Sequence, residues 1–102
     1  MIDPSILAYA STKGALETLV RNWAAILGPS GIRVNAVAPG VIDTDMSNFT
    51  KTDGGREVVL GMQALKRIGK PQDVADVVAF VASDAARWIT GASIPVDGGS
   101  KL

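Results

Sequence analysis

The sequence predicts an α/β domain, and three observations support this prediction. A helical pattern begins at Asp3-Pro4 and is stopped by the breakers at 28–31. A β-rich segment without a breaker follows at 32–38, so helix, short turn and strand form half of an α/β unit. A second helix and a second strand come later in the chain. Because two strands cannot form a stable open sheet alone, we expect this chain to be part of a larger sheet.

The first helix should have Asp3 as its N-cap and Pro4 as its first residue. Its apolar stripe consists of Leu16, Leu19, Val20, Trp23 and Leu27. Gly14 costs a helix roughly 1 kcal/mol against alanine, so we expect something to approach closely there. A partner helix, a flat ligand and ordinary packing inside one core all fit this expectation.

The predicted strand ends at Pro39-Gly40. In open α/β sheets, ligands bind beyond the carboxyl ends of the strands, and residues 39–44 occupy that location. Gly40 leaves the backbone open to close approach, and Thr44 adds a hydroxyl that can bond a phosphate or an amide. A simple turn, with Asp43 or Thr44 capping the next helix, is the alternative.

The segment 46–70 has the least regular pattern. Residues 47–55 are polar and include Gly54-Gly55, so we expect them to be mobile, with a short helix after them at 56–62. The apolar contacts of that helix would be Val58, Val59 and Met62. Met46, Leu60 and Met62 would suit a lid over an apolar substrate, although a surface loop with locally packed methionines is equally compatible.

The second long helix should begin at Pro71 and end near Asp84, with Asp73 placed to favour the helix dipole. Its apolar face would contain Val74, Val77, Val78 and Val81. A short strand follows at 92–96, and Pro95 restricts that strand to the edge of a sheet.

Composition narrows the possible chemistry. The 102 residues suit one small domain, and ten basic residues balance ten acidic ones, which argues against nucleic acid or an anionic membrane surface as a partner. The sequence contains no histidine and no cysteine, so we expect no metal site and no Ser-His-Asp triad. No apolar run approaches a membrane span, and we expect a soluble, cytoplasmic protein. Acid/base catalysis would depend on carboxylates, a lysine or a tuned tyrosine.

Tyr9 and Lys13 form the pair that fits this last possibility. Positions i and i+4 lie on one face of a helix. A cation about 5–6 Å from a phenol stabilises the phenolate by roughly 3 kcal/mol at an effective dielectric of about 20. That energy would lower the pKa of Tyr9 by roughly two units. The same spacing also arises by chance, so the two residues alone leave a structural role open.

Four segments resemble, in order, the C-terminal portion of the short-chain dehydrogenase/reductase family. They read YASTKGAL (9–16), IRVNAVAPG (32–40), RIGKPQDVA (67–75) and TGASIPVDGG (90–99). The resemblance covers nearly the whole chain. It implies that residues 1–102 are the C-terminal segment of one Rossmann-like, doubly wound parallel sheet, with about three helices and two strands and the dinucleotide-binding half absent. It also implies NAD or NADP as the cofactor.

The resemblance further implies a role for each matching residue. Tyr9 would exchange a proton with the substrate oxygen, and Lys13 would bond the nicotinamide ribose and lower the pKa of the tyrosine. Pro39 and Gly40 would border the nicotinamide, the backbone of Ile42 would bond its carboxamide, and Thr44 would reach the carboxamide or the phosphates. The pocket for an alcohol or carbonyl substrate would include Val41, Met46 and Met62.

Two further expectations follow from the resemblance. The long helix would form one contact between copies of the chain, and the C-terminal helix with the edge strand would form another.

The family's glycine-rich phosphate turn, its active-site asparagine and its catalytic serine are not among the 102 residues. We therefore expect this chain to be inactive alone, and the residues present choose neither the substrate nor NAD over NADP.

Two other interpretations remain open. A half-fold with an exposed strand edge and uncovered apolar helices could be a non-enzymatic oligomerisation or interaction module. Alternatively, a separate chain could supply the first half of the domain and restore activity.

Overall fold

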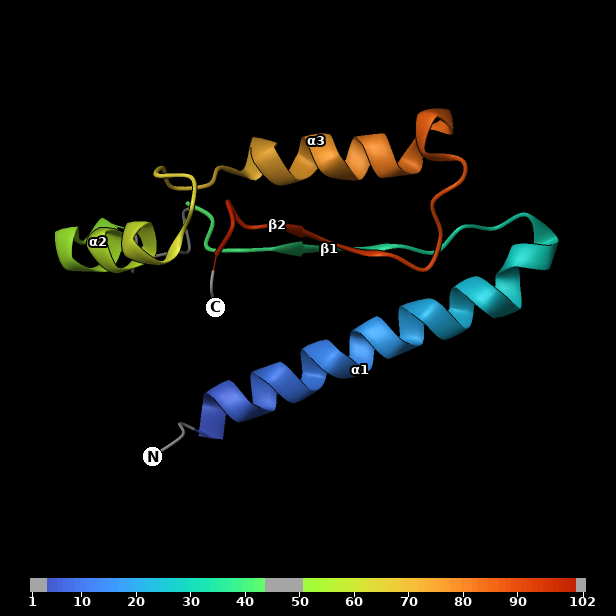
Figure 1. The fold of residues 1–102 in the computed structure, drawn as a ribbon, viewed down its shortest axis with the longest axis horizontal. Coiled ribbons are helices and arrows are strands. Elements are labelled where there is room, and N and C mark those ends of the chain that lie inside the picture. Colours follow the sequence, from blue (N-terminus) through green and yellow to red (C-terminus); the bar gives the residue numbers. More distant parts are fainter. Residues whose placement is uncertain (1–3, 44–50, 101–102) are drawn as a thin grey trace. The chain divides into compact units, whose positions relative to one another are not determined.

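The computed structural model of the protein describes residues 4–43 and 51–100. In these ranges the longer elements are three helices and two strands, as the sequence predicts (Figure 1). They are α1 (Pro4–Leu27), β1 (Ala36–Pro39), α2 (Asp53–Met62), α3 (Pro71–Ala82) and β2 (Ser93–Val96). The chain divides into two compact units, Met1–Ala36 with Ala86–Ser93 and Val37–Ala85 with Ile94–Leu102.

In the first unit, α1 ends where the breakers predict. A 3₁₀ turn at Gly28–Ser30 follows the helix, and Gly31 adopts a left-handed φ of 77° that places its N–H 2.9 Å from the carbonyl oxygen of Gly28. Val20 and Ala24 are buried. Gly91 packs against this side of α1, because a Cβ atom there would lie 3.4 Å from the Cβ of Ala24.

The predicted strand 32–38 is longer than the observed strand β1. Residues 33–35 run beside 89–92, but side chains take several of the ladder bonds. The N–H of Val34 donates to the hydroxyl of Thr90 at 3.0 Å, and the amide oxygen of Asn35 accepts from the N–H of Ala92 at 3.0 Å. Because these bonds replace backbone–backbone pairs, the regular strand begins only at Ala36.

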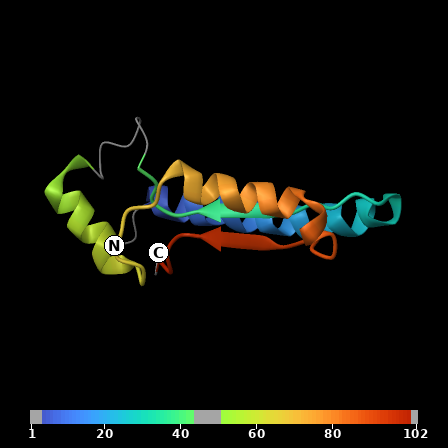
Figure 2. The same ribbon diagram turned by 90° about the horizontal axis from the view of Figure 1, so that it is seen from above.

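Strand β1 pairs with β2 in a two-stranded sheet. Figure 2 shows the two strands pointing in the same direction, so the pairing is parallel. At the carboxyl end of the strand pair, the N–H of Gly40 donates to the carbonyl oxygen of Val96 at 3.0 Å. Pro95 lies in β2, which pairs with β1 alone among the described strands, in agreement with an edge position. Helix α3 lies along the strands and buries Val81, whereas Val78, which was predicted on the same buried face, is exposed.

Helix α2 corrects the prediction of an irregular segment through Gly55. It begins at Asp53 and therefore includes Gly54 and Gly55. The hydroxyl of Thr52 accepts from the N–H of Gly55 at 3.0 Å and caps the helix, and Val59 is 1% exposed. The cap and this burial offset the cost of two glycines. Met62 is half-buried as expected, but Val58 is exposed.

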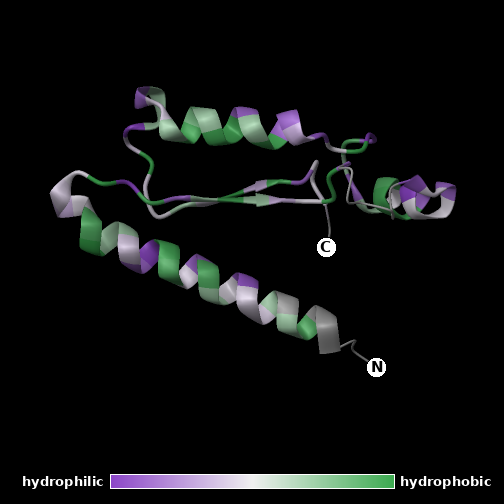
Figure 3. Cartoon of the chain, turned by 180° about the vertical axis from the view of Figure 1, so that it is seen from behind, coloured by the Kyte–Doolittle hydropathy of each residue, from purple (hydrophilic) through white to green (hydrophobic). Residues whose placement is uncertain are grey.

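Hydropathy along the helices is uneven. Figure 3 shows apolar residues recurring along α1 and α3 between polar ones. None of the described helices combines the length and the apolar character needed to span a membrane.

Candidate functional site

Tyr9 and Lys13 both belong to α1, which continues without interruption through both positions. Lys13 therefore follows Tyr9 by about one helical turn on the same face. The Lys13 side chain is exposed, whereas the side chain of Tyr9 lies outside the described part. Among the described residues, and apart from the local helix backbone and the two chain neighbours, no atom lies within 4 Å of a Cβ added at Gly14. Packing inside the unit's own core therefore does not explain the glycine.

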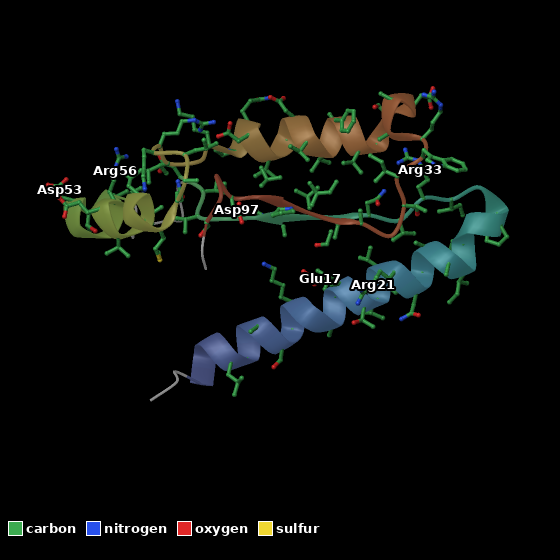
Figure 4. All side chains as sticks on the ribbon, viewed as in Figure 1. Glu17, Arg21, Arg33, Asp53, Arg56 and Asp97 are labelled. Atoms are coloured by element: carbon green, nitrogen blue, oxygen red, sulfur yellow. The ribbon has the colours of Figure 1, made fainter. Side chains whose placement is uncertain are left out.

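The carboxyl end of β1 is built against the loop that follows β2. A Cβ on Gly40 would lie 2.7 Å from the Cβ and 2.9 Å from the Cα of Asp97, so only glycine fits this position without a shift of the backbone. The sequence predicts Gly40 as a point of open approach for a ligand. On this side of Gly40, however, the space belongs to Asp97, which Figure 4 labels near the strand pair.

The peptide groups of Ile42 are oriented by its neighbour Gly69. Ile42 forms a parallel bridge with Gly69, and the N–H of Asp43 donates to the Gly69 carbonyl at 2.7 Å. Because this bridge uses peptide groups on either side of Ile42, the N–H and C=O of Ile42 itself point away from Gly69. A Cβ on Gly69 would lie 2.9 Å from Cδ1 of Ile42, the far end of a side chain that can rotate away, and 3.3 Å from the carbonyl oxygen of Val41.

A cleft of ≈ 390 Å³ lies beside this strand end, entirely within the second unit. Its lining residues are Val41, Ile42, Gln63, Ala64, Leu65, Arg67, Gly69, Asp73, Pro95, Val96, Asp97, Gly98 and Gly99. Two of the predicted site residues, Val41 and Ile42, therefore line one cleft, and Met62 is not in its wall. Sequence reasoning missed Gln63 and the loop around it, because a single buried glutamine after a short helix leaves no periodic pattern.

Gln63 organises the wall of this cleft. Its side chain is 6% exposed, and its Nε2 donates to the carbonyls of Leu65 at 3.0 Å and Arg67 at 2.8 Å. The turn held in this way pairs with the C-terminal loop, where the N–H of Leu65 donates to the Gly98 carbonyl at 2.8 Å. The wall of the cleft is therefore fixed by hydrogen bonds on both sides.

Arg67 and Asp73 form a two-pronged ion pair at the cleft. The guanidinium donates to both carboxylate oxygens at 2.7 and 2.8 Å, and the N–H of Lys70 donates to the same carboxylate at 2.8 Å. The hydrogen bonds from Arg67, followed by that from the Lys70 backbone, hold the pKa of Asp73 well below its usual range. The same pairing raises the pKa of Arg67.

The other predicted site residues are distributed as follows. Pro39 and Gly40 lie at the end of β1 in the second unit, whereas Tyr9 and Lys13 belong to the first. Thr44 and Met46 lie outside the described residues. Within the described ranges, no three acidic side chains come together in a way that could hold a metal ion.

Comparison with known proteins gives consistent matches. A family profile described as enoyl-(acyl carrier protein) reductase matches residues 2–101. The 3-oxoacyl-[acyl-carrier-protein] reductase FabG of Pseudomonas aeruginosa is 47% identical over 91 residues, which are 89% of this chain and 36% of that enzyme.

Solved structures agree with the sequence matches. A short-chain type dehydrogenase/reductase from Mycobacterium ulcerans superposes with a TM-score of 0.85 at 40% identity, covering 90% of this chain and 34% of the other. A 4-hydroxyisoleucine dehydrogenase complexed with NADH superposes with a TM-score of 0.88 at 35% identity, covering 97% of this chain and 41% of the other. The chain thus spans little more than a third of the length of the proteins it resembles.

Proposed function

Because the chain belongs to the short-chain dehydrogenase/reductase family, we propose that it supplies the proton-transfer pair and the nicotinamide-facing strand end of an NAD(P)-dependent oxidoreductase. The reaction would transfer a hydride between nicotinamide and an alcohol or carbonyl substrate. The observation that carries the proposal is the position of Tyr9 and Lys13 one turn apart on the continuous helix α1.

The two side chains would have different tasks. The phenol of Tyr9 would give a proton to a carbonyl oxygen during reduction and take one from a hydroxyl during oxidation. The ammonium of Lys13 would donate to the hydroxyls of the nicotinamide ribose, and its positive charge would favour the phenolate form of Tyr9. When bound, the cofactor would supply or accept the hydride.

The end of β1 fits the carboxamide of a nicotinamide. No described residue bonds the N–H or the C=O of Ile42, and both point away from Gly69. A primary carboxamide offers one acceptor and two donors, which match this donor and acceptor. Pro39 and Gly40 would flank the ring, and Thr44 would add a hydroxyl to the carboxamide or the phosphates.

The substrate side would be largely apolar. Val41 lines the cleft, and Met62, which lies outside the cleft wall, would join Met46 in covering the substrate. We also propose that the 102 residues as an isolated polypeptide do not turn over substrate. They contain neither a glycine-rich phosphate turn nor the serine and asparagine that the family places near its tyrosine.

A chimera tests the catalytic role separately from the inactivity of the isolated chain. Residues 9–99 of this chain would replace the matching third of the Pseudomonas FabG, and 3-oxoacyl reduction would be followed with NADPH and NADH. We expect an active chimera, and we expect Tyr9→Phe to lower its kcat by about 10²–10⁴-fold, the usual contribution of a general acid.

Thr18→Ala is the matched control, because Thr18 lies on α1 and its exposed hydroxyl donates to the carbonyl of Gly14 in the same helix. This variant should keep the activity of the chimera. An active chimera that tolerates Tyr9→Phe would refute the proposed role of Tyr9. Turnover by the isolated 102-residue chain would refute only the proposed inactivity.

We further propose that copies of the chain associate through α1. In the structure the apolar stripe of α1 widens to include Ile26 on one side and Ala24 on the other. Leu19 and Ile26 are exposed, whereas Val20 and Ala24 are buried. Such a half-covered stripe supports a contact with another polypeptide.

A further inference from the structure

The side-chain amide oxygen of Gln63 is a hydrogen-bond acceptor that no described residue uses. Both side-chain hydrogen bonds of its amide are made by Nε2, to the carbonyls of Leu65 and Arg67. Two carbonyl partners require the nitrogen at this position, so the orientation of the amide is fixed by chemistry. Among the described residues, none donates to Oε1.

This oxygen is not sealed inside the protein. No side-chain oxygen or nitrogen in the described, solvent-excluded interior lacks a partner, so the unpaired Oε1 keeps some accessible surface. Gln63 is 6% exposed and forms part of the wall of the ≈ 390 Å³ cleft. An acceptor without a partner therefore belongs to an otherwise buried side chain in the wall of the cleft.

The other charged side chains of the cleft each have at least one hydrogen-bond partner. Arg67 and Asp73 neutralise each other through two hydrogen bonds, and Oδ1 of Asp97 accepts from the N–H of Gly99 at 2.9 Å. Val41, Ile42 and Leu65 contribute apolar wall. A ligand that fits would be a small, mainly apolar molecule with one donor placed to meet Gln63.

We propose that Gln63 determines the ligand preference of this cleft, its Oε1 accepting a hydrogen bond from a hydroxyl or amide N–H on the ligand. If the cleft serves the oxidoreductase proposed above, that ligand is the distal part of the substrate, and in this respect the inference rests on the proposed function. A site built around a hydrogen bond rejects an analogue that lacks the donor, because the buried acceptor stays unpaired.

The test measures binding without turnover, using the full 102-residue chain labelled with ¹⁵N and no cofactor. Cyclohexanol and cyclohexanone are matched in size, but only the alcohol carries a donor. Titrations would follow the backbone amides of Val41 and Leu65 and the side-chain NH₂ of Gln63. We expect cyclohexanol to bind about tenfold more tightly than the ketone. Equal affinities, or shifts confined to residues outside the cleft, would overturn the proposal.

Variants locate the acceptor. Gln63→Leu keeps an apolar side chain of similar length and should reduce the preference for the alcohol to about onefold. Gln72→Leu is the matched control, because Gln72 is an exposed glutamine on α3, and it should leave the preference unchanged. Asp97→Asn should also leave the preference unchanged, and loss of the preference in this variant would assign the acceptor to Asp97 instead.

Gln63→Leu leaves two carbonyls without a donor and could unfold the loop. The alcohol–ketone comparison on the unaltered chain decides the proposal in that case. The chimera tests the catalytic proposal separately from this one. Tyr9→Phe should lower turnover in the chimera and should leave cyclohexanol binding to the 102-residue chain unchanged.

Discussion

Gly40 illustrates how packing alone can require glycine at a position in the candidate site. A Cβ at this position would meet the Cβ and Cα of Asp97 at 2.7 and 2.9 Å, and the nearby backbone cannot yield as a flexible side chain would. We expect Gly40→Ala to lower the free energy of unfolding by about 1–3 kcal/mol, as overpacking does. Urea denaturation followed by circular dichroism measures the change.

Gly14→Ala is the control for this prediction. Its added Cβ makes no close contact with the described residues outside its own helix turn, and alanine stabilises a helix interior by about 0.5–1 kcal/mol relative to glycine. The two substitutions should therefore have opposite signs. A Gly40→Ala variant as stable as the unaltered protein would show that the loop at Asp97 yields easily.

At the residue scale, the sequence predicts which side chains are chemically suited to a site better than it predicts their contacts in the fold. Tyr9 and Lys13 are recognisable because their types and spacing follow helix geometry, and α1 is indeed continuous through both. Their roles in catalysis stay predictions. Gln63 was not predictable, since its importance depends on carbonyls of a turn whose shape no local pattern specifies. The glycine at 40 is recognisable as special, but the residue that makes it so lies far along the chain.

At the scale of elements, the start of α3 depends on a charge. Asp73 accepts from the N–H of Lys70 and from Arg67, and its pKa is held well below its usual range. A carboxylate with a depressed pKa in the folded state stabilises the protein above its unfolded-state pKa of about 4, and this contribution is lost as the pH falls further. The stability difference between the unaltered protein and Asp73→Asn should therefore be largest near neutral pH and shrink below about pH 4.

Urea denaturation at several pH values measures this difference, and Arg67→Met provides the control. The hydrogen bonds from Arg67 are the largest cause of the shift, so Asp73→Asn should cost less stability at neutral pH when Arg67 is already replaced. A stability difference that does not vary with pH would contradict the assignment. The exposure of the pair means that added salt should weaken its contribution.

The ends of helices and strands are where the sequence patterns predict the structure least accurately. The long helices were predicted well, because proline and glycine mark their ends and apolar residues recur at helical spacing. The strand before Pro39 was predicted too long, since β-rich residues do not reveal that Thr90 and Asn35 side chains replace ladder bonds. The start of α2 was missed because the cap by Thr52 outweighs the glycines that follow it.

At the scale of the whole molecule, the apolar surface of α1 is larger than its buried side. Viewed down the helix axis at about 100° per residue, Ile26 marks one edge of the apolar stripe and Ala24 the other. The two edges are roughly 160° apart. Ala24 and Val20 are buried, whereas Leu19 is 45% and Ile26 is 68% exposed. The matched proteins are nearly three times as long, so residues outside this chain are one candidate cover and a second copy is the other.

The FabG chimera separates these two candidates, because it contains the remainder of the fold. We expect Leu19→Glu with Ile26→Glu to raise the dissociation constant between copies by at least about tenfold, since each apolar side chain loses about 1.5–3 kcal/mol of burial. Sedimentation velocity over a range of concentrations measures the association. Ala25→Glu adds the same charge on the opposite face of α1 and should leave it unchanged. If the double variant instead unfolds the chimera without changing the association of its folded fraction, the stripe is covered within one copy, and α1 is not the contact between copies.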